Sequence, residues 1–206
     1  MTSHNGEKLQ SPIATAHAGV SVQHGLSAAG GFYGFYRLGS AADEGYSLDI
    51  MDAEFLAHVA ALKPKLEALL AMKPVKPSHL PSEMPKAGVY LLSDGAEYLY
   101  VGRSNDIRGR IGRHCRPGAT HRMAAFAFRL ARHATGRLDA TYKTGEGSRA
   151  ALVLEPVFKG AFMEAKARIR EMELRFVEEA DPVRQALLEV YVALAVKAKH
   201  NDFDNH

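Results

Sequence analysis

Four prolines within residues 73–86, at positions 74, 77, 81 and 85, divide this chain into two parts. Because proline fixes φ and has no backbone N–H, neither a helix nor a central strand can run through this segment. We therefore predict an extended linker at residues 73–86. The part that follows, residues 87–206, is long enough to bury a hydrophobic core of its own.

The part before the linker divides again. Residues 1–30 are rich in Ser, Ala, Gly and His without sustained periodicity, which predicts a disordered tail. Residues 31–72 begin with an aromatic and glycine-rich segment, which either packs locally, the interpretation we prefer, or offers stacking faces to nucleobases. A helical pattern of apolar residues then begins at Asp52 and is interrupted at Pro64, which is expected to open a second short helix ending at Met72.

The part after the linker begins with a predicted β-hairpin, residues 89–92 and 98–101. A two-residue turn at Asp94-Gly95 would mix apolar and polar groups on both faces of this hairpin. A loop centred on Gly95 pairs Tyr90 with Tyr100 and leaves one apolar face, made of Val89, Leu91, Leu99 and Val101. We prefer this second register because burial of one face fixes the register of a strand, although Asp-Gly favours two-residue turns.

An arginine-rich helix is predicted directly after the hairpin, with Ser104 as its N-cap. Ile107 and Ile111 are four residues apart and are expected to face the core. Arg110 and His114 show the same spacing and fall beside the isoleucines on the helix surface. We therefore expect these two polar side chains to border the buried face.

Further helices are predicted at residues 123–133 and 160–170, and a third strand at residues 174–177. Asp181 is the expected N-cap of a last helix, because Pro182 follows it and suits the first helical position. The expected core stripe of this helix consists of Val183, Leu187, Val190 and Leu194.

Positive charge is concentrated in one stretch of the sequence. Residues 103–137 hold nine arginines and one acidic residue, Asp106, although the whole chain has a net charge of only +3. Guanidinium groups present a planar fork that matches phosphate oxygens. This block predicts a polyanion partner, and a solvated basic face is the alternative that the block alone leaves open.

Composition excludes several classes of protein. An apolar fraction of 47% and a charged fraction of 24% are typical of globular chains, which excludes complete disorder. The sequence has no run of about 18 apolar residues that would span a membrane, and its first residues do not resemble a secretory signal. A single cysteine, Cys115, excludes an internal disulfide and a cysteine-rich zinc site. We therefore expect a cytoplasmic protein without membrane contact.

An ordered set of residues runs through the part after the linker. The tripeptides Gly88-Val89-Tyr90 and Tyr100-Val101-Gly102 lie on the two predicted strands of the hairpin, Arg110 and His114 lie on the helix that follows, and Glu189 and Asn201 come late in the chain. In this order the residues resemble the GIY-YIG nucleases, with valine in place of isoleucine in both tripeptides. The resemblance covers residues 87–206.

The resemblance implies a small α+β domain, in which helices flank a three-stranded antiparallel sheet. It also implies hydrolysis of phosphodiester bonds in nucleic acid, with DNA as the expected substrate. A single divalent cation, Mg²⁺ or Mn²⁺, is the implied cofactor.

The resemblance assigns roles to individual residues. Tyr90 is expected to act as the general base, which requires nearby cations because a free phenol has a pKa of about 10. Arg110 and His114 are suitable neighbours for that phenolate, and Arg110 would also bind the phosphate oxygens. Glu189 would be the protein's ligand to the metal, whose other ligands are largely water.

Two further roles follow from the same resemblance. Tyr100 would position the attacking water or the metal's water shell, and Asn201 would orient the phosphate or a neighbouring side chain. The arginine block and a nearby histidine supply the expected nucleic-acid contacts: Arg103, Arg108, Arg113, Arg116, His121 and Arg122.

Each of these residues also has a purely structural interpretation. Tyrosines on adjacent strands commonly form a stabilising cross-strand pair, and a lone helical glutamate is commonly an exposed charge. Asn201 can equally cap the last helix.

The alternative function is a catalytically inactive nucleic-acid-binding module with the same fold. An interaction domain that does not bind nucleic acid would leave the arginine block unexplained. Both a monomer and a homodimer remain open.

Overall fold

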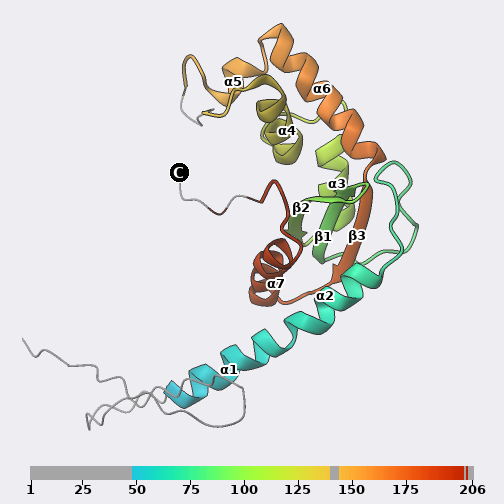
Figure 1. Ribbon diagram of the computed structural model, residues 1–206, viewed down its shortest axis with the longest axis vertical. Coiled ribbons are helices and arrows are strands. Elements are labelled where there is room, and N and C mark those ends of the chain that lie inside the picture. Colours follow the sequence, from blue (N-terminus) through green and yellow to red (C-terminus); the bar gives the residue numbers. More distant parts are fainter. Residues whose placement is uncertain (1–47, 140–143, 202, 204–206) are drawn as a thin grey trace, which may run out of the picture. The chain divides into compact units, whose positions relative to one another are not determined.

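The computed structural model describes residues 48–139, 144–201 and 203, which belong to one compact unit that begins at residue 46. The predicted tail and the aromatic, glycine-rich segment lie outside the described residues. The fold is α+β, as predicted, with helices around a three-stranded antiparallel sheet of strand order β2-β1-β3 (Figure 1).

The strands are β1 (Gly88–Asp94), β2 (Glu97–Ser104) and β3 (Glu173–Glu178). Two helices precede them, α1 (Leu48–Ala60) and α2 (Leu62–Ala71). Four helices lie between β2 and β3 in the chain: α3 (Ile107–Cys115), α4 (Ala125–Thr135), α5 (Arg149–Leu152) and α6 (Pro156–Glu171). The last helix is α7 (Pro182–Ala195). Each of these elements except α5 is among those predicted from the sequence.

Local signals explain several element ends. Pro64 is the third residue of α2, where its missing N–H interrupts no helical hydrogen bond, as expected. Gly136 ends α4 in the left-handed conformation, with φ of 70°. Asp181 caps α7 as predicted, because its side chain accepts a hydrogen bond from the Arg184 N–H at 2.8 Å.

The N-cap predicted at Ser104 is wrong. Asp106 caps α3 instead, and its carboxylate accepts a hydrogen bond from the Gly109 N–H at 2.9 Å. Ser104 ends β2, and its hydroxyl accepts a hydrogen bond from the Asp106 N–H at 2.9 Å. The two polar side chains therefore share the turn between strand and helix, and only the second one caps.

The proline-rich segment is extended, but it does not separate two units. Val75 exchanges two hydrogen bonds with Leu174 of β3, at N···O distances of 3.0 and 2.7 Å. Val75, Leu80 and Met84 pack against the main hydrophobic core. The division expected at residues 73–86 is therefore corrected: apolar residues between the prolines attach this segment to the sheet and core, within the unit that contains α1 and α2.

The register of the hairpin differs from the predicted one by two residues. Tyr90 lies opposite Gly102, and Tyr100 lies opposite Leu92. An irregularity next to Leu92 admits one extra residue, Leu99, before a two-residue turn at positions 95 and 96. The predicted pairing of Tyr90 with Tyr100 is therefore wrong, but a shift of two residues keeps both tyrosines on the same face of the sheet.

Helices cover both faces of the sheet, so the expectation of a single apolar face is also wrong. The face that carries Tyr90 and Leu92 packs against α3, α4 and α6 in the main core. The face that carries Val89, Leu91 and Val101 packs against α2 and α7. The central strand β1 is consequently buried from Gly88 to Ser93.

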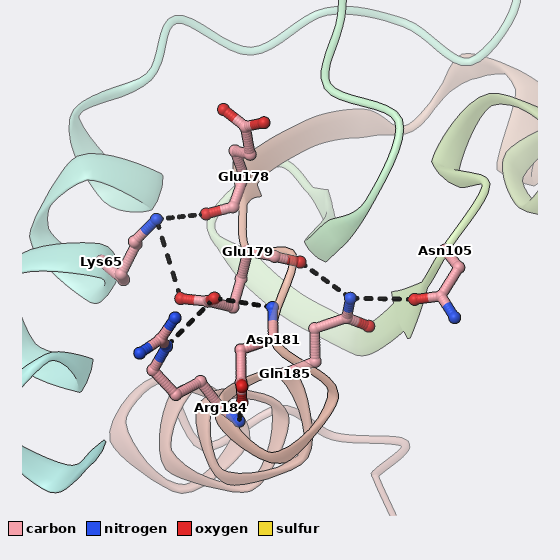
Figure 2. A network of polar contacts seen from close by, with 7 residues as sticks. All are labelled: Lys65, Asn105, Glu178, Glu179, Asp181, Arg184 and Gln185. Carbon is pink, nitrogen blue, oxygen red and sulfur yellow. Dashed lines mark hydrogen bonds and ion pairs between the residues drawn. The ribbon is translucent and has the colours of Figure 1, made fainter.

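Buried polar contacts hold the start of α7, as Figure 2 shows. The buried carboxylate of Glu179 accepts hydrogen bonds from the Asp181 N–H at 3.1 Å and from Arg184 Nε at 3.2 Å. Lys65 Nζ of α2 lies 3.8 Å from the same carboxylate. Because a buried carboxylate is costly without such partners, these contacts fix where α7 begins relative to β3 and α2.

The face of α7 that meets the sheet is not the predicted one. Val183, Val190 and Leu194 of the predicted core stripe are exposed, so that prediction is wrong. The buried face instead carries Gln185, Leu188 and Val192.

Gln185 explains this rotation of the helix. Its side-chain amide donates hydrogen bonds to the Glu179 carbonyl at 2.7 Å and to Asn105 Oδ1 at 3.0 Å (Figure 2). A polar side chain can be buried when its groups are paired in this way. Glu189 lies one turn after Gln185 and therefore points from the same side of α7.

Close packing at Gly102 yields a stability prediction. A Cβ atom on Gly102 would lie 2.4 Å from the hydroxyl oxygen of Tyr90 and 2.5 Å from its Cζ. Tyr90 is fully buried and cannot swing aside. We expect Gly102→Ala to lower the free energy of unfolding by about 1–3 kcal/mol, a usual cost of overpacking, as measured by urea denaturation.

Gly160→Ala is the matched control for this experiment. Gly160 lies within α6, and a Cβ there would meet nothing within 4 Å. The same substitution should raise the free energy of unfolding by up to about 1 kcal/mol, because alanine favours the helix. A Gly102→Ala variant as stable as the unmodified chain would contradict the packing described here.

Candidate active site

Two tyrosines and a histidine pack together on the sheet face that meets α3 and α4. Tyr90 Oη lies 2.8 Å from His114 Nε2, and both side chains are fully buried. The ring centroids of Tyr90, Tyr100 and His114 lie 5.8–6.3 Å apart. Tyr100 is partly exposed and stacks on Phe126 of α4 at 4.5 Å between ring centroids. The two hydroxyl groups therefore differ in access to solvent.

Arg110 joins this group from α3. It precedes His114 by one helical turn, so both side chains lie on the same face of the helix. Its half-buried guanidinium is close enough to Tyr90 and Tyr100 for its charge to lower the pKa of both phenols, against the larger effect of burial. We call Tyr90, Tyr100, Arg110 and His114 the tyrosine–arginine cluster.

Glu189 approaches the cluster from α7. Its Oε2 lies 3.0 Å from Arg103 Nε of β2, and its side chain is 24% exposed. The negative charge of Glu189 raises the pKa of both cluster tyrosines, which reflects its closeness to them. Of the six residues that the sequence singled out as catalytic, the structure packs Tyr90, Tyr100 and His114 together, with Arg110 beside them on α3 and Glu189 paired with Arg103 near enough to act on both phenols.

Burial dominates the ionisation of the cluster. It raises the pKa of Tyr90 far above the ordinary value of a phenol, Tyr100 raises that pKa further, and Arg110 lowers it only in part. Burial also raises the pKa of Tyr100. It lowers the pKa of His114 to about 3, and Arg110 acts in the same direction. Both phenols and the imidazole are therefore neutral near pH 7, and the expected stabilisation of a Tyr90 phenolate is not met by these residues alone.

Burial also raises the pKa of Glu189, against the opposing effects of Arg103 and Arg110. The carboxylate of Glu189 is therefore surrounded by positive charge from Arg103 and Arg110. A divalent cation carries a higher charge than a guanidinium group and could replace Arg103 as the partner of this carboxylate.

Asn201 lies beside β2. Its side-chain oxygen accepts a hydrogen bond from the Val101 N–H, and its side-chain amide donates one to the Val101 carbonyl, both at 2.8 Å. Its predicted role, to orient the phosphate or a neighbouring side chain, stays a prediction. The asparagine holds the middle residue of the second tripeptide by its main chain.

The neighbours of Asn201 continue the same contact. The Lys199 N–H donates to the Tyr98 carbonyl at 3.1 Å, and the His200 N–H donates to the Leu99 carbonyl at 2.9 Å. Residues 199–201 therefore run beside β2 and are hydrogen-bonded to it.

The basic residues predicted to bind nucleic acid have varied surroundings. Arg103 contacts the cluster through Glu189. Arg108 donates hydrogen bonds to the carbonyls of Pro81 and Ser82, and Arg113 lies 3.9 Å from Asp106.

The other three residues predicted to bind nucleic acid form no hydrogen bond with the tyrosine–arginine cluster within the described residues. Arg116 donates to the Gly112 carbonyl at 3.3 Å, and Arg122 is exposed. The ring of His121 packs 6.3 Å from that of Phe128, and burial, together with Arg149 and Arg122, lowers its pKa.

Arg129 of α4 is a neighbour of the cluster that sequence reasoning did not single out. Its charge lowers the pKa of Tyr100, and its guanidinium donates a hydrogen bond to the His200 carbonyl. Arg129 belongs to the arginine block, but no motif in the sequence distinguishes it from the other arginines. Its position near Tyr100 depends on how α4 packs against β2, which a local sequence pattern does not predict.

The residues of the site fit one type of metal coordination. Among the described ranges there is no group of three or more His, Cys, Asp or Glu side chains that could hold an ion. Glu189 supplies one hard oxygen ligand near the cluster. This donor set fits a Mg²⁺ ion that keeps several waters and binds substrate phosphate, and it does not fit a cage made of protein ligands alone.

Comparisons with protein-family models, with curated proteins and with solved structures found no match to this chain. Within residues 48–139, 144–201 and 203, no helix has both the length and the apolar character needed to cross a membrane.

Neutral, buried His114 makes stability depend on pH. A histidine in an unfolded chain has a pKa of about 6.5, whereas burial lowers the pKa of folded His114 to about 3. Below pH 6.5 or so the unfolded chain binds a proton that the folded chain does not, so the free energy of unfolding falls with falling pH. His114→Gln should reduce that slope by about 1.4 kcal/mol per pH unit between about pH 6 and pH 4, as measured by urea denaturation.

His200 provides a companion variant, because burial lowers its pKa to about 4. The double variant should therefore show a shallower slope than either single variant. An unchanged slope in His114→Gln would show that this histidine is protonated in the folded chain.

Proposed function

We propose that this chain is a metal-dependent endonuclease that hydrolyses phosphodiester bonds of nucleic acid, with DNA as the expected substrate, in the manner of the GIY-YIG nucleases. The observation that supports the proposal is convergence. Tyr90, Tyr100 and His114 pack together with Arg110 beside them, and Glu189 of α7, paired with Arg103, is near enough for its charge to act on both phenols. Hydrolysis of a phosphodiester requires a proton acceptor, a phosphate-binding cation and a metal ligand, and these residue types supply all three.

Tyr90 would act as the general base in its phenolate form. In the proposed step the attacking water forms a bond to phosphorus and gives a proton to Tyr90 Oη, and the bond from phosphorus to the leaving oxygen breaks. Because burial keeps the phenol neutral, the phenolate requires positive charge nearby, which Arg110 and a bound divalent cation would supply. Neutral His114, whose Nε2 lies 2.8 Å from Tyr90 Oη, would donate a hydrogen bond to the phenolate, which requires the tautomer that carries the proton on Nε2.

Arg110 and Glu189 would complete the reaction site. Arg110 would bind the phosphate oxygens as negative charge develops on them. Glu189 would hold the divalent cation, which when bound neutralises phosphate charge and assists the leaving oxygen. Arg103, the present partner of Glu189, is about half exposed and would then be available to a phosphate of the substrate.

One observation favours the second candidate, an inactive nucleic-acid-binding module. Tyr90 is fully buried, so in this conformation neither water nor a phosphate reaches its hydroxyl. If the protein is a nuclease, side chains around Tyr90 must move to admit the substrate. Tyr100 and Arg110 are partly exposed neighbours of Tyr90 whose movement would open this path. As a binding module, it needs no such movement.

Cleavage assays separate the two candidates. Labelled duplex, single-stranded and branched DNA would be incubated with the full chain in Mg²⁺, in Mn²⁺ and in EDTA. We expect cleavage that EDTA abolishes, and losses of at least about 100-fold in Tyr90→Phe and Glu189→Gln, because each removes a group from the chemical step. Binding, measured by fluorescence anisotropy in EDTA, should change little.

Two substitutions of the same residue types outside the tyrosine–arginine cluster control for structural effects. Tyr98→Phe removes a hydroxyl from β2 on the opposite face of the sheet, and Glu164→Gln removes an exposed charge from α6. Both should cleave at the rate of the unmodified chain. Binding without cleavage in either metal would support the inactive module, and full activity in Glu189→Gln would reject the assigned metal ligand.

A further inference from the structure

A small cavity adjoins the tyrosine–arginine cluster on the side of α4. Its walls include Tyr100 of β2, Arg129 and Arg132 of α4, and Arg149, the first residue of α5. The cavity has a volume of about 90 Å³, which is sufficient for a phosphate group. We call it the arginine cavity.

Main-chain carbonyls hold the three arginines in place. Arg129 donates to the His200 carbonyl, Arg132 Nε donates to the Arg137 carbonyl at 3.1 Å, and Arg149 Nη2 donates to the His121 carbonyl at 2.8 Å. These bonds orient the guanidinium forks, but a neutral carbonyl does not cancel the positive charge of Arg129 or Arg132.

The charges of Arg129 and Arg132 are not balanced locally. Within residues 48–139 and 144–201, neither forms an ion pair with a carboxylate. The sequence from 107 to 138, which includes all of α3 and α4, contains no aspartate or glutamate. Like charges around one cavity repel each other, and a bound anion relieves that repulsion.

Aromatic side chains also line the arginine cavity. The Arg149 guanidinium carbon lies 4.1 Å from the centre of the Phe128 ring, so this cation lies over the face of the ring. Tyr100 belongs to both the cavity and the cluster. An anion in the cavity would therefore lie next to the proposed reaction site.

We propose that the arginine cavity binds a second phosphate of the nucleic-acid strand, adjacent to the phosphate that is hydrolysed. The inference rests on the proposed function, because it assumes that the tyrosine–arginine cluster holds the phosphate that is hydrolysed. The nucleic-acid strand would then run from the cluster, past Tyr100, to α4. Arginine forks match the paired oxygens of a phosphodiester, and two fixed phosphates define the position of the scissile bond between them.

Salt-dependent binding tests the arginine cavity directly. Anisotropy of labelled single-stranded and duplex DNA would be measured in EDTA over a series of KCl concentrations, for the unmodified chain and for Arg132→Gln and Arg129→Gln. Each lost phosphate contact should reduce the slope of log affinity against log salt by about 0.7 for single strands or 0.9 for duplex, which corresponds to about 5- to 8-fold weaker binding at about 0.1 M salt.

Arg170→Gln is the matched control. Arg170 is an exposed arginine of α6 that does not line the cavity, and its substitution removes the same charge. Its slope should remain that of the unmodified chain. Equal slopes for Arg132→Gln and Arg170→Gln would overturn the proposal. Circular dichroism and the unfolding midpoint of each variant would show that its fold is retained.

Comparison with the cleavage assay separates this inference from the proposed function. Cleavage with unchanged slopes rejects the arginine cavity and retains the nuclease. Reduced slopes without cleavage in Mg²⁺ or Mn²⁺ reject the nuclease and retain the cavity as the phosphate site of a binding module. Arg132-dependent binding of inorganic phosphate, with no binding of nucleic acid, would overturn the assignment of the cavity to a strand.

Discussion

The hydroxyl group of Tyr90 is buried in the central strand of a sheet that helices cover on both faces, and such a group must be hydrogen-bonded. This requirement explains why α3 presents His114 and Arg110 on one face, one turn apart. It also explains Gly102, since the phenol lies where a neighbouring Cβ would be. The glycine of one tripeptide, the tyrosine of the other and the basic residues of α3 therefore form one unit of packing.

Sequence patterns predicted most of this framework. Alternating apolar residues, Asp181-Pro182 and the spacing of Ile107 and Ile111 were sufficient for the hairpin, the start of α7 and the inner face of α3. The shared face of Tyr90 and Tyr100 also followed, because an error of two residues in register leaves side-chain direction unchanged.

The remaining features depend on contacts between distant segments. The irregularity at Leu99 and the covering of the second face by α2 and α7 follow from packing that no local pattern encodes. The rotation of α7 was mispredicted for a related reason: Val183, Val190 and Leu194 form the more regular apolar stripe, but Gln185 finds buried partners in Glu179 and Asn105. Pairing of one polar side chain thereby outweighed hydrophobic periodicity, and the same rotation places Glu189 where it pairs with Arg103 of β2.

The contacts of residues 199–201 with β2 have a consequence for the behaviour of the whole sheet. An outer strand with unpaired N–H and C=O groups is a template on which another chain can add a strand. Here the main chain of Lys199 and His200 and the side chain of Asn201 occupy that margin of β2, and Val75 occupies part of the opposite margin at β3. Residues 199–201 therefore protect this margin of the sheet against strand addition and aggregation.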